Sequence, residues 1–447
     1  MRAPAGAHTA TSSGGRRARA IVGLAIVVGL SLRLAFAFGY WVGKPLKLDE
    51  TEYVQLARNL AAGQGFTYGS ATAGGTSPQF GRAPLYPAFL AGVLRASGAP
   101  PGPDNAAGRA ELNVIKGVQA VLGAAIIGLI GVLARRAAGG PAMAVAAAIA
   151  AVYPPLVWIG AYVLSEPLFM VLALGSAVAL GRVIDTDAVA ATTSRAGAPV
   201  TFAAGLLAGL ATLTRPIMLF FLLVAAAWCL RHGRWRTLTL FVAGALLVVL
   251  PWTAHNARTT GRFVLVASEG GVTFWTGNNA LSLGEGDLAA NPAMKQAEID
   301  LRRRHPGWTA DQLEPVYYRE AFDYIRSRPG AWVLLVARKF FYLWVPIGPS
   351  YRLHSARYVA ASVVSYVLLL PFALAGLRRL WQAGSRPRAL GMLAVAAVLS
   401  CLVFFPQERF RIPVLDPALV VCAAAWIGSR AGVSRVFAPS RDPQGLV

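Results

Sequence analysis

The sequence predicts an all-α polytopic membrane protein, and three observations lead to that prediction. Hydrophobic residues make up 56% of the 447 residues, only 14% are charged, and the mean hydropathy is +0.53. Soluble domains ordinarily carry about 25% charged residues. Apolar runs recur along the chain, several of them near the roughly 20 residues that a helix needs to cross a bilayer. The net charge of +22 resides in short basic clusters between these runs, which is the pattern that orients helices in a membrane and argues against a nucleic-acid partner.

The first predicted helix is an uncleaved span at 21–38, preceded by a disordered cytoplasmic tail at 1–18. Arg33 interrupts the apolar run and no clear cleavage site follows, so the run does not fit a signal peptide. Further apolar runs lie at 114–134, 141–160, 163–182, 200–214, 216–230, 237–254, 357–377, 389–405 and 412–428. Arg215-Pro216 separates two of these runs, and a proline breaks helical geometry together with its preceding residue.

A topology of ten spans with both termini inside places every basic cluster of the loops on the cytoplasmic side. These clusters are Arg135-Arg136, Arg182 with Arg195, Arg231-Arg234-Arg236, Arg378-Arg379-Arg386-Arg388 and Arg430-Arg435-Arg441. Two shorter apolar stretches, 84–97 and 331–346, are interpreted as interfacial or re-entrant helices on the outer side. Counting them differently gives a bundle of about 10–13 transmembrane helices.

This topology divides the chain into an N-terminal and a C-terminal membrane part with an outer cap between them. The N-terminal module covers 19–254 and contains a large first outer loop at 40–113. The predicted cap covers 255–356, the C-terminal helices 357–428, and a second cytoplasmic tail 429–447.

The acidic residues are few and therefore informative. Among only 20 Asp and Glu residues, Asp49, Glu166 and Glu408 all fall at the predicted outer face. An acid at a helix start also complements the helix dipole, which is the simpler explanation for Glu50 and Glu52 and an equal one for Glu166. Asp49 stands at an apolar boundary, where ionisable groups are functional candidates.

Four arginines on the same predicted face go against the cytoplasmic bias of the other basic residues. They are Arg82, Arg215, Arg409 and Arg411. Each one alone is consistent with a solvated or headgroup-contacting side chain. Together around an acid they favour a pocket for an anionic group such as a lipid phosphate, because the planar guanidinium offers several donors in a fixed fork.

Several motifs on this face resemble those of a known family. Residues 48–60, LDETEYVQLARNL, followed by Gly63-Gln64-Gly65-Phe66, resemble the first outer loop of GT-C glycosyltransferases. The likeness is greatest to the bacterial branch related to protein O-mannosyltransferases and the lipid A aminoarabinose transferase. Later motifs agree in order and spacing, namely Arg82-Ala83-Pro84-Leu85-Tyr86-Pro87, Leu164-Ser165-Glu166-Pro167-Leu168, Leu213-Thr214-Arg215-Pro216, Pro251-Trp252, Gly277-Asn278-Asn279 and Arg409-Phe410-Arg411-Ile412-Pro413.

The resemblance implies a GT-C-like bundle that transfers a sugar, with inversion, from a polyprenyl-phosphate donor to an acceptor hydroxyl. The reaction would take place at the outer face of the bacterial inner or plasma membrane. By the same resemblance Asp49 is the general base, and we expect its dry setting to raise its pKa. Arg82, which stands where many relatives have lysine, would bind the donor phosphate, aided by Arg215, Arg409 and Arg411. Glu166 and Glu50 would be supporting acids, and Glu50 would orient a neighbouring basic side chain.

The sugar, the acceptor and a metal ion are less well defined by the sequence. Candidates for the sugar or acceptor site are Tyr53, Tyr86, His255, Trp275 and Asn278. Some proteins of this family bind a divalent metal ion, which Asp49 and Glu166 would hold here, and the sequence does not require one. The sugar is open, and the acceptor is a lipid, a glycan or a protein, with membrane lipids around the chain and no nucleic acid.

Three other function classes compete with this one. A transporter or flippase for an anionic lipid or lipid-linked sugar would also use charges at membrane depth, but no internal repeat is visible and the candidate charges gather on one face. A polymerase or ligase for lipid-linked glycans would place its arginines in a large late loop. A non-catalytic scaffold gives no reason for Asp49 and Arg82.

Overall fold

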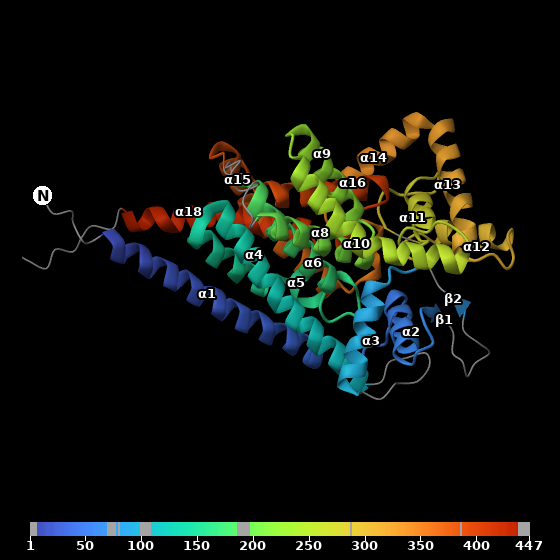
Figure 1. The fold of residues 1–447 in the computed structure, drawn as a ribbon, viewed down its shortest axis with the longest axis horizontal. Helices are drawn as coiled ribbons and strands as arrows, with labels where there is room; N and C mark the ends of the chain where they lie inside the picture. Colours follow the sequence, from blue (N-terminus) through green and yellow to red (C-terminus); the bar gives the residue numbers. More distant parts are fainter. Residues whose placement is uncertain are drawn as a thin grey trace, which may run out of the picture.

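The computed structural model describes residues 7–68, 77–78, 81–98, 109–185, 197–286, 288–384 and 387–436. Within these residues the protein is a bundle of helices with a single small antiparallel sheet, in which β1 (Thr67–Tyr68) pairs with β2 (Ser77–Pro78) (Figure 1). The predicted all-α polytopic membrane architecture is confirmed.

The bundle is built from long apolar helices that match the predicted apolar runs. These helices are α1 (Ala7–Ala35), which continues into the π-turn η1 (Phe36–Tyr40), α4 (Arg109–Val152) with the short α5 (Pro154–Trp158), α6 (Glu166–Ile184), α8 (Gly197–Thr214), α9 (Met218–Arg231), α10 (Trp235–Thr260), α15 (Ala356–Gln382), α16 (Arg388–Val403) and α18 (Leu415–Val436). Among the described residues, 6 helices are long and apolar enough to cross a membrane, and α9 and α16 are shorter apolar helices. The ten predicted crossings therefore stay a prediction.

Helix α4 contains two of the predicted spans. Its backbone leaves helical geometry at Ala138 and at Gly139, whose φ of 84° is favourable only for glycine. Pro141 follows in the first turn after the break, where its missing N–H is tolerated. The break comes directly after Arg135-Arg136, where the sequence predicts a cytoplasmic turn.

Parts of both predicted tails are helical, so the disorder expected for 1–18 is wrong for the residues described there, whereas the cytoplasmic location of both tails stays a prediction. Helix α1 begins at Ala7, and α18 continues to Val436. In both cases the apolar helix extends beyond the membrane-length run through small and basic residues, which are compatible with a helix. Residues 1–6 and 437–447 lie outside the described part of the chain, as do Arg195 and Arg386 of the predicted cytoplasmic clusters.

Packing within the bundle uses small residues, as expected where helices associate in an apolar medium. Helices α8 and α10 approach so closely that a Cβ atom on Gly209 would lie 2.7 Å from the carbonyl oxygen of Ala245. Large apolar side chains on the outside of the bundle, such as Leu223, Leu247 and Leu368, remain exposed in the protein alone. These side chains are positioned to contact lipid.

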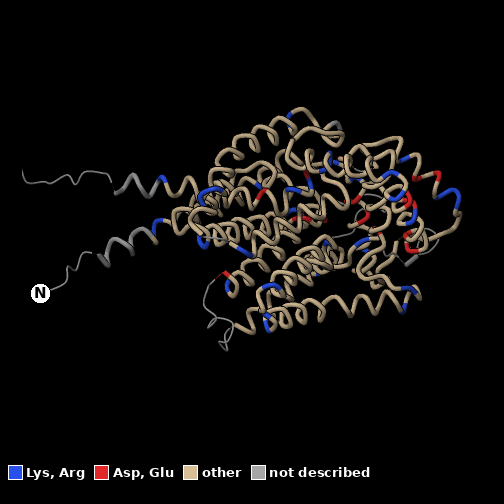
Figure 2. Tube along the Cα trace, turned by 90° about the horizontal axis from the view of Figure 1, so that it is seen from above, with Lys and Arg blue, Asp and Glu red and all other residues tan. Residues whose placement is uncertain are grey.

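The predicted first outer loop and cap lie at one end of the bundle, opposite the described start of α1 and end of α18 (Figures 1 and 2). The first loop forms α2 (Asp49–Ala61), β1, β2 and α3 (Leu85–Ser97). The cap forms α11 (Gly270–Gly277), α12 (Pro292–Arg303), α13 (Ala310–Ser327), α14 (Pro329–Trp344) and the 3-10 turn η2 (Pro349–Leu353). Figure 2 shows most acidic residues of the described chain gathered at this end.

The cap has a small hydrophobic core of its own. Trp275 from α11, Met294 and Leu301 from α12, and Leu313 and Tyr317 from α13 are buried against one another. This core holds the cap as a unit. A short helix from the C-terminal part of the chain, α17 (Glu408–Arg411), lines the same cavity as α2 and the cap.

Candidate functional site

A cavity of about 520 Å³ opens where the first loop, the cap and α17 meet. Its charged wall consists of Asp49, Glu52, Arg82, Arg215, Glu269 and Arg409. Its apolar wall includes Ile217, Phe404, Phe405 and Phe410, with Val272 and Leu288 from the cap. The cap also contributes Thr273 and two further charged residues, Lys295 and Glu298. The cavity thus has a charged side and an apolar side, as a site for an amphipathic ligand requires.

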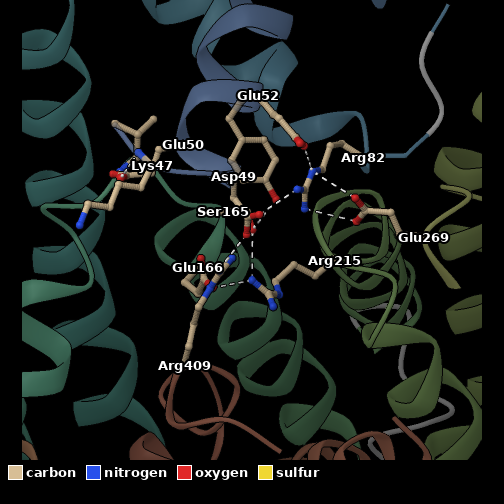
Figure 3. A network of polar contacts seen from close by, with 12 residues as sticks. Lys47, Asp49, Glu50, Glu52, Arg82, Ser165, Glu166, Arg215, Glu269 and Arg409 are labelled. Atoms are coloured by element: carbon tan, nitrogen blue, oxygen red, sulfur yellow. Dashed lines mark hydrogen bonds and ion pairs between the residues drawn. The ribbon is translucent and has the colours of Figure 1, made fainter. Parts of the chain in front are cut away.

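Asp49 is the first residue of α2, and the residue before it is strained. Leu48 has a φ of 44°, a conformation that side-chain-bearing residues rarely adopt, and its own side chain is 72% exposed. Backbone strain of this kind persists only where surrounding structure enforces it, and it is found often at functional sites. Here it directs the Asp49 carboxylate into the cavity (Figure 3).

Arg82 joins three carboxylates, two from α2 and one from the cap (Figure 3). Its Nη2 donates to Asp49 Oδ1 at 2.8 Å, and its Nε donates to Glu52 Oε2 at 2.6 Å. Glu269 is the loosest partner, with contacts of 3.2 Å to Nε and 3.3 Å to Nη1. One cation therefore faces more negative charge than it can neutralise.

Arg409 connects the two acids that the sequence singles out. Its Nη1 donates to Asp49 Oδ2 at 2.7 Å, and its Nε donates to Glu166 Oε1. Arg215 Nη1 reaches the same Glu166 oxygen at 2.6 Å. Glu166 is fully buried, so the two arginines compensate a carboxylate that water cannot reach.

The pKa of Asp49 is opposite to the sequence expectation. Burial alone would raise it, but Arg409 and Arg82 each contribute charge and a hydrogen bond, and they hold the pKa well below its ordinary value. The expectation of a raised pKa was wrong because the burial of Asp49 is accompanied by two cations on its two oxygens.

Glu269 behaves differently although it shares Arg82 with Asp49. Burial raises its pKa, Arg82 opposes that rise, and the nearby charges of Asp49 and Glu52 add to it, giving a pKa of about 7. Its side chain is 40% exposed. The pKa of Glu269 is therefore shifted in the opposite direction from that of Asp49.

The site does not fit a shared divalent ion on Asp49 and Glu166. The Arg409 guanidinium lies between the two carboxylates and donates to both. No group of three or more metal-ligating side chains occurs among the residues that the structure describes. We therefore assign the bridging charge between these acids to Arg409.

Among the predicted sugar-site residues, only Tyr53 lines the cavity. Tyr86 is fully buried beneath it, with its ring 4.9 Å from that of Tyr53 and its hydroxyl donating to Gln119. The structure does not bring the other candidates to the cavity. His255 is exposed and stacks on Trp252, Trp275 belongs to the cap core, and Asn278 is buried, where it accepts from Lys339.

Two further candidates have structural surroundings instead. Glu50 lies apart from the arginines, beside Lys47 (Figure 3), and its oxygens accept the backbone N–H groups of Lys47 at 3.1 Å and Val163 at 2.9 Å. It ties the start of α2 to the loop before α6, so it does not orient a basic side chain as predicted. Arg411 is 2% exposed and paired with Asp416, out of reach of the cavity, so we omit it from the phosphate-binding set.

Sequence reasoning missed Glu269 and underrated Glu52. Glu269 precedes Gly270-Gly271 in the cap, and nothing in that local pattern distinguishes it from a solvated acid. Glu52 lies three residues after Asp49, so the helical period alone places both on one face of α2. That signal was present in the sequence.

The comparisons with known proteins concern the fold. No protein-family model matches the sequence, and no curated protein matches it either. Among solved structures, the oligosaccharyltransferase AglB from Archaeoglobus fulgidus, in complex with an inhibitory peptide and a dolichol-phosphate, superposes with a TM-score of 0.58 at 14% identity over 96% of this chain. A second AglB structure, with Zn and sulfate, gives a TM-score of 0.53 at 12% identity over 93% of this chain and 49% of that chain. ArnT from Cupriavidus metallidurans, bound to undecaprenyl phosphate, gives 0.44 at 17% identity over 93% of this chain and 78% of that chain.

The AglB likeness shows that this chain has the predicted GT-C fold. The chain covers 52% of the AglB chain that it matches, so it spans about half the length of that protein.

Proposed function

We propose that this chain, which has the GT-C fold, is a glycosyltransferase that moves a sugar from a polyprenyl-phosphate donor to an acceptor hydroxyl. The observation that carries the proposal is the cavity in which Asp49 and three arginines lie beside an apolar wall. The solved relatives support the donor class, since one is described with a dolichol-phosphate. The sugar and the acceptor stay open.

The donor phosphate would bind between Arg82, Arg215 and Arg409. The hydrogen bonds of Arg215 to described residues come from Nη1, with its guanidinium also over the ring of Phe410, and those of Arg409 come from Nε and Nη1. Their other N–H groups remain available at the cavity wall for an anion. Fixed guanidinium donors stabilise charge on a departing phosphate at little reorganisation cost, because they are already in place.

In the proposed reaction the acceptor oxygen attacks C1 of the sugar from the side opposite the phosphate. The new C1–O bond forms as the bond from C1 to the phosphate oxygen breaks, and its electron pair leaves with polyprenyl phosphate. Asp49 takes the proton of the acceptor hydroxyl. Attack from the opposite side inverts the configuration at C1.

The low pKa of Asp49 suits a resting state that changes when the donor arrives. Without a ligand, both carboxylate oxygens accept from guanidinium groups. A phosphate that attracts Arg82 and Arg409 would weaken these bonds and raise the basicity of Asp49. Donor binding would thereby prepare the base.

The reaction would take place at the outer face of the membrane. The first loop and the cap, whose residues line the cavity, lie at the end of the bundle opposite the described start of α1 and end of α18 (Figures 1 and 2). The basic clusters of the predicted cytoplasmic loops favour the other end as the inside. This orientation supports an acceptor that is reached from outside the cell.

A first prediction concerns metal ions. Because Arg409 supplies the positive charge between Asp49 and Glu166, we expect turnover to change less than about twofold after dialysis against a chelator, which is near the precision of such assays. Addition of Mn²⁺ or Mg²⁺ to the dialysed protein should give no increase. A loss of activity that either ion restores would contradict this assignment.

A second prediction concerns pH and Glu269. Below pH 7 Glu269 is largely neutral, so Arg82 is freer to bind the donor phosphate. As the pH rises through about 7, Glu269 ionises and competes for Arg82. Donor KM should therefore increase between pH 6 and 8, by up to about tenfold. In Glu269→Gln the donor KM should not change with pH over this range. If it still increased with pH in the variant, another group would be responsible for the titration.

The proposal is tested by following the C1–phosphate bond. Purified protein in liposomes is given a panel of labelled polyprenyl-phosphate sugars with extracts of candidate acceptors. A glycosyltransferase releases polyprenyl phosphate, whereas a flippase moves the intact lipid between leaflets. Movement of intact donor without release would overturn the proposal in favour of transport.

A further inference from the structure

We propose that the buried ion pair of Arg411 with Asp416 positions Arg409 for the donor phosphate. The inference rests on the proposed function and extends it to residues outside the cavity. Arg411 Nε donates to Asp416 Oδ1 at 2.8 Å, and the two side chains are 2% and 0% exposed. Neither residue is among those that line the cavity.

Two tyrosines from separate parts of the bundle contact the pair. The Arg411 guanidinium carbon lies 3.8 Å from the ring centroid of Tyr366 in α15. Tyr153, which precedes α5, donates from its hydroxyl to Asp416 Oδ2 at 3.2 Å. Tyr366 in turn donates to the carbonyl oxygen of Trp344 at the end of α14. Arg411 and Asp416 thus connect α17 and α18 to α15 and to the residue before α5, and through Tyr366 to α14.

Helix α17 needs such an anchor because it is too short to hold itself. It has four residues, Glu408–Arg411, and helices of one turn are unstable without tertiary contacts. Glu408 and Arg411, three apart, are buried on its inner side, while Arg409 and Phe410 face the cavity. The side chain that reaches Asp49 and Glu166 is therefore held from behind by Arg411.

A buried ion pair is a costly way to stabilise a fold, since apolar residues of similar size often do as well. Its value here is orientation. The fork of Arg409 has to reach Asp49 and Glu166 together, and a shift of α17 would break one of these contacts. Arg411 and Asp416 are positioning residues, and Arg409 is the group that touches the ligand.

The test is a double-mutant cycle read out by binding of decaprenyl phosphate to the full-length protein in detergent. Asp416→Asn should weaken binding about tenfold when Arg409 is present, which is in the range of coupling within one polar network. In an Arg409→Lys background the same change should weaken binding less than about twofold, because the group that it positions is already gone. In an Arg82→Lys background, which keeps Arg409, Asp416→Asn should again weaken binding about tenfold.

Two further variants separate positioning from folding. Arg411→Met combined with Asp416→Leu replaces the pair by apolar groups and should keep the melting temperature while it weakens binding as Asp416→Asn does. Glu111→Gln removes the acid of another buried ion pair, 2.6 Å from Arg58. It should lower the melting temperature, and any effect that it has on binding should be the same with Arg409 as with lysine at position 409.

The outcomes distinguish this inference from the function on which it rests. If Asp416→Asn weakened binding equally in the wild-type and the Arg409→Lys backgrounds, the positioning role would be overturned while the proposed function stands. Failure of the wild-type protein both to bind decaprenyl phosphate and to turn over any lipid-phosphate sugar would overturn the proposed function, and this inference with it.

Discussion

Asp49→Asn should reduce the turnover of a polyprenyl-phosphate sugar by about a hundredfold or more, the usual contribution of a positioned general base. Asparagine has nearly the same shape and cannot accept the proton of the acceptor hydroxyl. It also carries no charge to pair with Arg82 and Arg409. The arginines are then freer to bind phosphate, so the donor KM should stay the same or fall while kcat drops.

This split between kcat and KM is what identifies a base rather than a binding residue. The measurement is release of polyprenyl phosphate at several donor concentrations with the matched acceptor. Asp300→Asn, an exposed acid on α12 that pairs only with its helix neighbours, is the control and should behave as wild type. If Asp49→Asn retained wild-type kcat, the base would have to be a different group.

Arg409→Lys should lower kcat/KM by about a hundredfold, and both constants should change. A lysine ammonium is a single point charge, whereas the guanidinium of Arg409 donates from separate nitrogens to Asp49 and Glu166. With lysine at this position, one of the two acids loses one of its two arginine partners, and the phosphate loses part of its contacts. Glu166 is then a buried carboxylate that depends on Arg215 alone.

The control for Arg409→Lys is Arg95→Lys on α3. Arg95 is exposed and donates to the carbonyl oxygens of Leu60 and Ala61, away from the cavity. It should keep kcat/KM within about twofold of wild type, as surface substitutions usually do. Equal losses in the two variants would show that the effect comes from arginine removal in general and not from the site.

Much of the charged wall could be predicted from the sequence because its residues fall on one predicted membrane face. Asp49, Glu166 and Arg409 are far apart in the chain, and charge clusters and span lengths alone place them at the same predicted end. The structure brings them within hydrogen-bond distance. Their order and spacing also carry the resemblance to the GT-C fold, which the structural comparison confirms.

The sequence could not distinguish Arg409 from Arg411. The two residues are close neighbours in one motif, and a single turn of helix directs one into the cavity and the other into the bundle. Only tertiary contacts decide which is which. The same limit applies to two sugar-site candidates, since Trp275 packs in the cap core and Asn278 bonds to Val403 and Lys339.

Protonation was also beyond the reach of the sequence. Dry surroundings raise the pKa of a carboxyl and nearby cations lower it, and the balance depends on distances. For Asp49 the cations prevail, since both oxygens have an arginine partner. For Glu269 burial prevails, since Arg82 is at a longer distance and is shared with two other acids.

The most direct test of the central claim is to follow both products of the proposed transfer with the purified wild-type protein. A polyprenyl-phosphate sugar labelled in the lipid and in the sugar is supplied with an acceptor, and the released lipid phosphate and the glycosylated acceptor are quantified together. We expect equal amounts of the two products, with inverted configuration at C1. The proposed transfer would be contradicted if every donor stayed intact with every acceptor tested, or if the product retained the configuration at C1.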